Sequence, residues 1–199
     1  LHEYQDILRT YKKKLKKVQI DMTSENDEVD TYLENITELL EDIMTTFRDL
    51  SKAFYDKKPG GIKIKSNDGD NTIRFDIIAK IQDDSSDGVN EVKIFCFDMT
   101  ILLMKQNHKC EFLFHDSRLF SNMDPRQRYT LFKLANDKVS NKGLQYIATI
   151  NEDTLLSFKD LMTPEEYYEI IEKNTRLTLT DESDKSKLLG IQVDMDYEK

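Results

Sequence analysis

The stretch Phe112 to Ser117 reads FLFHDS, a short apolar run that ends in polar residues. A similar run, QYIATI over residues 145–150, precedes Asn151, and the pattern predicts a helix between the two runs from Pro125 to Ser140. A strand, a helix and a second strand in this order indicate a parallel crossover unit. Open α/β sheets bind ligands beyond the carboxyl ends of their strands. We therefore expect a site at the polar ends of these two runs, formed by Asp116, Ser117 and Asn151.

The segments on either side of this unit predict the rest of an α/β lobe over residues 57–199. The predicted elements are a β-hairpin from 62–65 and 72–81, a buried helix over 89–105, a helix starting near Thr163, and edge strands over 175–180 and 188–193. His115 is expected to make a hydrogen bond within its strand.

The first third of the chain contains no helix breaker, because its six glycines and three prolines all lie at or after Pro59. Apolar residues recur there at every seventh position: Leu1, Leu8, Leu15, Met22, Val29, Ile36, Ile43 and Leu50. This spacing predicts a coiled-coil arm over residues 1–56, roughly 80 Å long as one helix and ended by Gly60 and Gly61. A second apolar series changes its spacing across residues 23–27, which indicates either a stutter or a helix break. A helical hairpin packed on its own domain is the alternative.

Composition excludes several classes of protein. The 199 residues include 38 acidic and 29 basic side chains, for a net charge of −9, and only 38% are hydrophobic. No stretch resembles a membrane helix or a secretory leader, and two cysteines, Cys96 and Cys110, are too few for a disulfide framework, which favours the cytoplasm. The acidic balance argues against broad nucleic-acid binding, although lysines within residues 12–17 form a local basic patch. The start at Leu1 suggests a fragment.

Taken in order, these parts resemble the C-terminal half of an ABC-type ATPase head of the SMC/RecN-like class. In that class a descending coiled coil enters a β-hairpin, a serine-glycine loop opens a buried helix, and an apolar Walker B strand ends in aspartate. The sequence looks like the C-terminal domain of an uncharacterised bacterial family of such coiled-coil ATPases, which carries His-Asp-Ser at the Walker B position, here His115, Asp116 and Ser117. The resemblance covers nearly the whole chain and implies an α/β C-terminal lobe of a P-loop ATPase head with a long coiled-coil segment.

The resemblance assigns nucleotide contacts to two segments. Ser86 and Gly88 match a signature loop, whose serine and following helix N-terminus contact the γ-phosphate of ATP held by the opposite head, while Asp87 and Val89 depart from that loop. Asp116 matches the Walker B aspartate that holds Mg²⁺ through water, a role suited to a hard oxygen ligand.

Three further positions match the ATPase class with departures. Ser117 replaces a glutamate that orients or deprotonates water, so hydrolysis is expected to be slow unless another carboxylate, such as Glu91, Glu111 or Asp124, substitutes. Asp124 also matches the D-loop that runs between heads, one residue later than usual. Asn151 stands where relatives carry the switch histidine that senses the γ-phosphate.

No Gly-x-x-x-x-Gly-Lys-Ser/Thr P-loop occurs in the sequence. In the SMC class this motif precedes the coiled coil, so ATP and Mg²⁺ are expected to bind only together with the N-terminal half of the head, and the fragment alone to be inactive. The expected partners are that half, a second copy bound through the head or the coiled coil, and DNA or a partner protein, with no membrane. Two other functions stay open: a non-enzymatic coiled-coil scaffold, and a metal-dependent nuclease that uses Glu111, Asp116 and Asp124.

Overall fold

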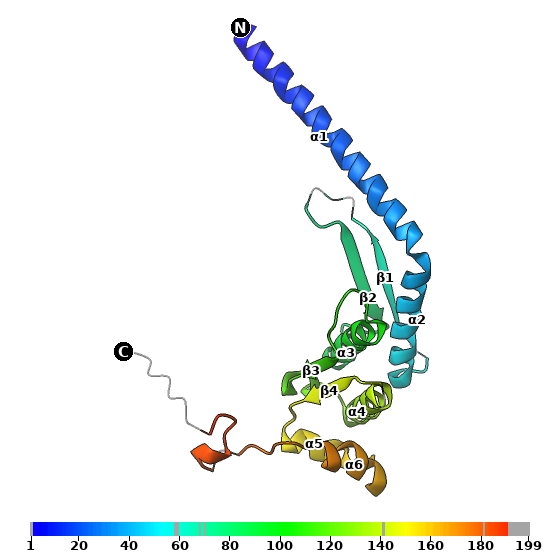
Figure 1. The fold of residues 1–199 in the computed structure, drawn as a ribbon, viewed down its shortest axis with the longest axis vertical. Coiled ribbons are helices and arrows are strands. Elements are labelled where there is room, and N and C mark those ends of the chain that lie inside the picture. The colour runs from blue at the N-terminus through cyan, green and yellow to red at the C-terminus, as the bar shows by residue number, and fades with distance from the viewer. Residues whose placement is uncertain are drawn as a thin grey trace, which may run out of the picture.

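The computed structural model describes residues 2–57, 60–67, 69, 71–140, 142–180 and 182–190. Figure 1 shows a long helical arm that leads into a smaller lobe. The arm consists of α1 (His2–Asn35) and α2 (Thr37–Phe54), which follow one bent path and do not fold back on each other as a hairpin would. The helices of the arm agree with the sequence pattern, and the pairing of the arm in a coiled coil stays a prediction.

The interruption between α1 and α2 lies at Ile36, and α1 is continuous across residues 23–27, so of the two alternatives for that segment the helix break is not observed and the stutter stays a prediction. Ile36 has φ −108° and ψ 20°, but its amide and carbonyl keep hydrogen bonds of helical spacing. Residues 23–27 remain helical because they contain no glycine or proline. The Thr23 hydroxyl donates to the Gln19 carbonyl at 3.0 Å, a hydrogen bond within the same helix.

An antiparallel hairpin joins the arm to the lobe. Its strands, β1 (Gly60–Ser66) and β2 (Phe75–Ile81), pair Gly60 with Ile81 and Ser66 with Phe75. The arm helix ends earlier, at Phe54, so Gly60 and Gly61 begin a strand and do not terminate the helix as predicted. Gly60 is needed there because a Cβ atom would lie 2.2 Å from the Ser51 hydroxyl oxygen on α2. The hairpin runs beside the arm (Figure 1).

The core of the lobe surrounds the helix α3 (Asp87–Met104), whose Phe95, Cys96 and Met99 are fully buried. α3 packs on β3 (Phe112–His115), and α4 (Pro125–Val139) packs on β4 (Gln145–Ala148). β3 and β4 pair in parallel, with Phe112 opposite Gln145 and His115 opposite Ala148. The strand, helix and strand predicted from the sequence are thus confirmed as a parallel crossover unit.

The C-terminal part is mostly helical and differs from the sequence prediction. It contains α5 (Glu152–Lys159), which the sequence pattern did not indicate, and α6 (Pro164–Ile170), which begins at Thr163 as predicted. Glu166 of α6 accepts a hydrogen bond from Lys133 of α4 at 2.7 Å. Short 3₁₀ turns are η1 (Ser117–Phe120), η2 (Glu172–Asn174) and η3 (Asp184–Ser186).

Neither predicted edge strand after α6 is observed within the described residues. Residues 175–180 pair with no strand in the described part of the chain, and residues 188–190 form a turn. The remaining residues of that second prediction, 191–193, lie outside the described residues. Alternating leucines predict an extended backbone, but a strand also needs a neighbouring edge with which to form hydrogen bonds.

Candidate functional site

Asp116, Ser117 and Asn151 follow the carboxyl ends of the parallel strands β3 and β4 and so lie at the same edge of the sheet, as predicted. The Asp116 carboxylate accepts a hydrogen bond from the backbone amide of Arg118 at 2.8 Å, and Ser117 is the first residue of η1. Asn151 has the extended backbone of an N-cap before α5, but its side chain makes no capping hydrogen bond. The Asn151 side chain is therefore not committed to the helix that it precedes.

A hydrogen-bonded network lies behind this edge, where the side chain of His115 is only 8% exposed. Its Nε2 is 3.0 Å from an oxygen of Asp98 on α3, and its Nδ1 is 3.0 Å from the hydroxyl of Tyr146 on β4. Because the Asp98 carboxylate accepts, a neutral His115 ring carries its proton on Nε2, and its Nδ1 then accepts from Tyr146. Burial raises the pKa of Tyr146, and the charge of Asp98 adds to this, so the hydroxyl keeps the proton that it donates.

This network corrects and extends the sequence-based expectation for His115. The ring bonds to neighbouring elements, whereas a bond within its own strand was expected. Asp98 and Tyr146 were not identified from the sequence, because polar residues inside buried apolar segments give no motif. Only the register of the two strands indicates the contact between His115 and Tyr146, because it places both side chains on the same face of the sheet. Phe95 packs edge-on against Tyr146 on that face, with 6.0 Å between the ring centroids.

The start of α3 contacts the loop between η1 and α4. Ser86 is the N-cap residue of α3 without a side-chain capping bond, and Gly88 is buried against the loop. A Cβ atom at Gly88 would lie 2.7 Å from the carbonyl oxygen of Asn122 and 3.1 Å from Oε1 of Gln127. Glycine is thus required for this close approach, whichever ligand the segment binds.

Glu91 lies one turn further along α3, and both its carboxylate oxygens are engaged. Oε2 accepts from the Asn122 backbone amide at 3.1 Å, and Oε1 accepts from the Asn122 side chain at 2.9 Å. Burial raises the pKa of Glu91, and the two hydrogen bonds from Asn122 oppose that increase. The structure therefore brings together the Ser86–Gly88 segment and the loop before Asp124, which the sequence pattern described separately.

Asp124 caps α4. Its carboxylate accepts from the backbone amides of Arg126 at 2.8 Å and Gln127 at 3.0 Å. The Gln127 side chain accepts from the Asp124 amide at 2.7 Å and donates to the Tyr55 hydroxyl at the end of α2. Asp124 thus has a structural role as part of a capping box.

The carboxylates expected for a nuclease do not assemble. Glu111 precedes β3 and forms an exposed ion pair with Lys105 at 3.7 Å, while Asp116 follows the same strand and Asp124 caps α4. Across the described residues, no three His, Cys, Asp or Glu side chains are arranged to hold a metal ion.

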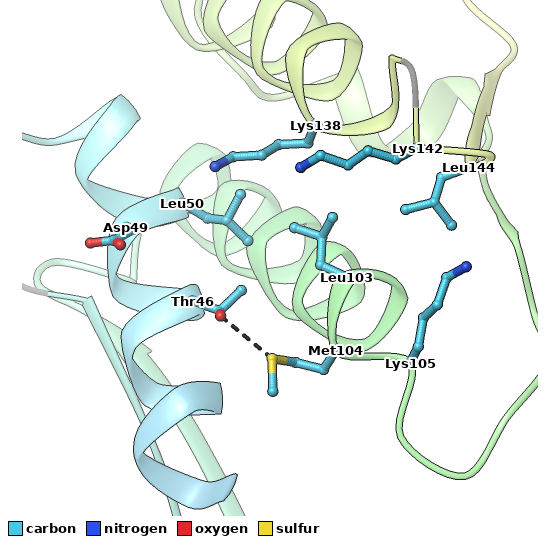
Figure 2. Close-up of a pocket in the computed structure, with 9 residues that line it drawn as sticks. All are labelled: Thr46, Asp49, Leu50, Leu103, Met104, Lys105, Lys138, Lys142 and Leu144. Atoms are coloured by element: carbon cyan, nitrogen blue, oxygen red, sulfur yellow. Dashed lines mark hydrogen bonds between the residues drawn. The ribbon is translucent and has the colours of Figure 1, made fainter. Parts of the chain in front are cut away.

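A hollow lies where α2 meets the ends of α3 and α4 (Figure 2), and its lining includes none of Asp116, Ser117 and Asn151. It has a volume of about 420 Å³, and its lining residues are Thr46, Asp49, Leu50, Leu103, Met104, Lys105, Lys138, Lys142 and Leu144. Lys138 and Lys142 both extend along its border (Figure 2). Lys105 is the C-cap residue of α3 and Lys138 lies in the last turn of α4, where a cation stabilises the exposed carbonyl groups. The helices thus account for these two lysines without a ligand.

Among the residues described, no helix combines the length and apolar character that crossing a membrane requires. A relative with 35% identity over 124 residues is the "Uncharacterized protein YydD" of Bacillus subtilis, and the match covers 61% of this chain but only 20% of the relative. The chain thus spans about a fifth of the length of that relative. Residues 50–193 match the model of a protein family described as "Uncharacterised protein conserved in bacteria (DUF2326)". This match includes β1 to α6 and both segments of the site, so the chain belongs to this bacterial family.

Proposed function

We propose that this chain is the C-terminal half of an SMC-like ATPase head, which binds ATP and Mg²⁺ together with an upstream P-loop half and dimerises when ATP is bound. The observation that carries the proposal is a face of the parallel sheet that the described residues leave uncovered. Phe112 and Phe114 of β3 and Ile147 of β4 point to the same face and are 54%, 49% and 37% exposed. Parallel sheets are normally covered on both faces, so this face calls for another layer of protein.

The opposite face of the same sheet is already covered by the core of the lobe. Leu113, Tyr146 and Ala148 pack against the hydrophobic cluster around α3 and α4. The sheet has only two strands among the described residues, with polar side chains at its carboxyl edge. Both features fit a sheet that continues into an upstream half, and the relative of about five times the length of the matched region leaves room for such a half.

Within this proposal each site residue has a defined role. Asp116 holds Mg²⁺ through water, Asn151 senses the γ-phosphate at the neighbouring strand end, and Ser86 and Gly88 meet the ATP of the opposite head. The uncommitted side chain of Asn151 supports its assignment. The capping bonds of Asp124 support a positional role for that residue in the D-loop-like segment and not a role as the base.

The proposal is tested by expressing the chain with the segment that precedes it in the full-length protein and measuring binding of Mg²⁺-ATP by the complex. Wild-type complex is expected to bind the nucleotide, and Asp116→Asn is expected to weaken Mg²⁺-dependent binding. Phe114→Asp should prevent association with the upstream half, whereas Leu156→Asp, at a comparably exposed position on α5, should not. An upstream segment without a P-loop, or normal association of Phe114→Asp, would refute the proposal.

A scaffold function without ATP turnover is the second candidate, and the arm favours it. Tyr4, Leu8, Tyr11 and Leu15 form an exposed apolar row along α1, which suits pairing with another helix. Both functions use the arm, so the nucleotide site discriminates between them. If Asp116→Asn leaves every activity of the full-length protein unchanged, the scaffold is the better description.

A further inference from the structure

The loop 120–124 is held against the first turns of α3 by a two-sided contact with Glu91. One carboxylate oxygen of Glu91 binds the backbone of Asn122 at 3.1 Å, and the other binds its side-chain amide at 2.9 Å. Hydrogen bonds to an ionised acceptor are stronger than those between neutral groups. The pair therefore fixes both the backbone position and the side-chain orientation of Asn122, and we call it the Glu91–Asn122 clasp.

An independent feature shows that the same two segments are in close contact. The Asn122 carbonyl oxygen lies so close to Gly88 that a Cβ atom would approach it to 2.7 Å. The clasp and this glycine contact Asn122 from different positions on α3, at its amide groups and at its carbonyl group. The loop therefore has little freedom to move relative to Gly88.

Arg128 of α4 holds the other side of the loop. Its guanidinium donates to the carbonyl oxygens of Phe120 at 3.0 Å and Ser121 at 3.1 Å, and to the Ser157 hydroxyl at 2.8 Å. The loop therefore lies between a carboxylate from α3 and a guanidinium from α4. Arg128 places the loop relative to α4, and the Glu91–Asn122 clasp places it relative to the start of α3.

We propose that Glu91 is a positioning residue, which locks the loop 120–124 to the Ser86–Gly88 turn so that both segments meet a second head as one rigid surface. This inference rests on the proposed function, because it concerns how the two elements assigned to the head interface are aligned. It also gives Glu91 a role other than that of the general base: both oxygens already accept hydrogen bonds within the chain. A misaligned interface weakens dimerisation and turnover, while Mg²⁺-ATP binding by a single head is retained.

The test exchanges the hydrogen-bond donors and acceptors of the Glu91–Asn122 clasp in the complex with the upstream half. Glu91→Gln places an amide donor against the donors of Asn122, and Asn122→Asp places two carboxylates face to face. Each single change is expected to lower ATP-dependent dimerisation and kcat by about tenfold or more, with the Kd of the isolated head for Mg²⁺-ATP unchanged. The double variant Glu91→Gln with Asn122→Asp restores both hydrogen bonds, because the introduced glutamine accepts from the backbone amide and donates to the introduced carboxylate, and it should recover most of the loss.

The controls separate this inference from the proposed function. Glu169→Gln removes an exposed carboxylate on α6, which binds Lys173, and is expected to behave as wild type. If wild-type complex shows no ATP-dependent dimerisation, the proposed function and the inference fail together. If wild type dimerises and Glu91→Gln does so equally well, or if the folded double variant fails to recover, only the positioning role of Glu91 is overturned.

Discussion

Replacement of Tyr146 by phenylalanine removes one hydroxyl from the buried network and leaves the ring in place. The ring keeps its packing against Phe95, Phe132 and His115, with centroid distances of 6.0, 6.4 and 5.6 Å. What is lost is the donor to His115 Nδ1, which was 3.0 Å away. The other neutral tautomer of His115 does not avoid the unpaired acceptor, because Nε2 would then be an acceptor facing the Asp98 carboxylate.

A buried acceptor without its partner costs about 1–3 kcal/mol. We therefore expect Tyr146→Phe to lower the free energy of unfolding by this amount and Tm by about 2–4 °C for each kcal/mol. Urea unfolding followed by circular dichroism measures the change, which should appear as a lower midpoint with an unchanged denaturant slope.

The matched control is Tyr168→Phe, which removes a hydroxyl from a tyrosine on α6 that is 54% exposed. Its free energy of unfolding should stay within about 0.5 kcal/mol of the wild-type value. If Tyr146→Phe is as stable as Tyr168→Phe, the hydroxyl does not support His115 and the assigned network is wrong.

Two further predictions concern titratable side chains. Cys110 is exposed, whereas Cys96 is fully buried and burial raises the pKa of its thiol. We therefore expect the native protein to react with one equivalent of maleimide and the denatured protein with two. Two adducts on the native protein would contradict the packing of α3. The hydrogen bond from Lys133 lowers the pKa of Glu166 in the folded protein. The ionised carboxylate therefore stabilises the fold above its unfolded pKa of about 4.3, and this stabilisation is lost as the pH falls through the lower pKa of the folded state. The stability difference between wild type and Glu166→Gln should therefore disappear in acid, and a difference that persists below both pKa values would contradict the assigned ion pair.

The sequence predicts elements whose pattern depends on local periodicity. The hairpin, α3 and the β3–α4–β4 crossover follow from alternating or helical apolar spacing, and all three are observed. α5 was missed because its eight residues are too few for the helical period to stand out. The strand expected over 175–180 was wrong for the opposite reason: its alternation is clear, but pairing depends on an edge that residues far along the chain, or another chain, must supply.

The candidate site shows the same division between local and distant information. Asp116, Ser117 and Asn151 were placed at one edge from the sequence, because parallel strands bring their carboxyl ends together. Asp98 is 17 positions from His115, and Glu91 is 31 positions from Asn122, so no motif links them. These contacts arise only when α3 packs across the sheet and the loop, which is a property of the tertiary structure.

Under the proposed function, Ser117 stands where a glutamate would act as the general base, so the base would have to be another carboxylate. The three substitutes named from the sequence, Glu91, Glu111 and Asp124, are each disfavoured. Both carboxylate oxygens of Glu91 already accept hydrogen bonds from Asn122, and the Asp124 carboxylate caps α4. Glu111 is weakly paired and more available, but it precedes β3 while Asp116 follows it, and extended chain between them spans about 16 Å.

Slow hydrolysis is therefore the expected behaviour of the complex with the upstream half, and Ser117→Glu should accelerate it. A positioned base contributes roughly 10²- to 10⁴-fold, so even a partly aligned glutamate gives a measurable increase in kcat. Ser117→Gln, of nearly the same size but without a basic carboxylate, is the matched control and should not increase kcat. Equal rates for the two variants would mean that position 117 does not face the attacking water. Rapid turnover by wild type would instead require a base other than Glu91, Asp124 or Glu111, because the geometry disfavours these three carboxylates.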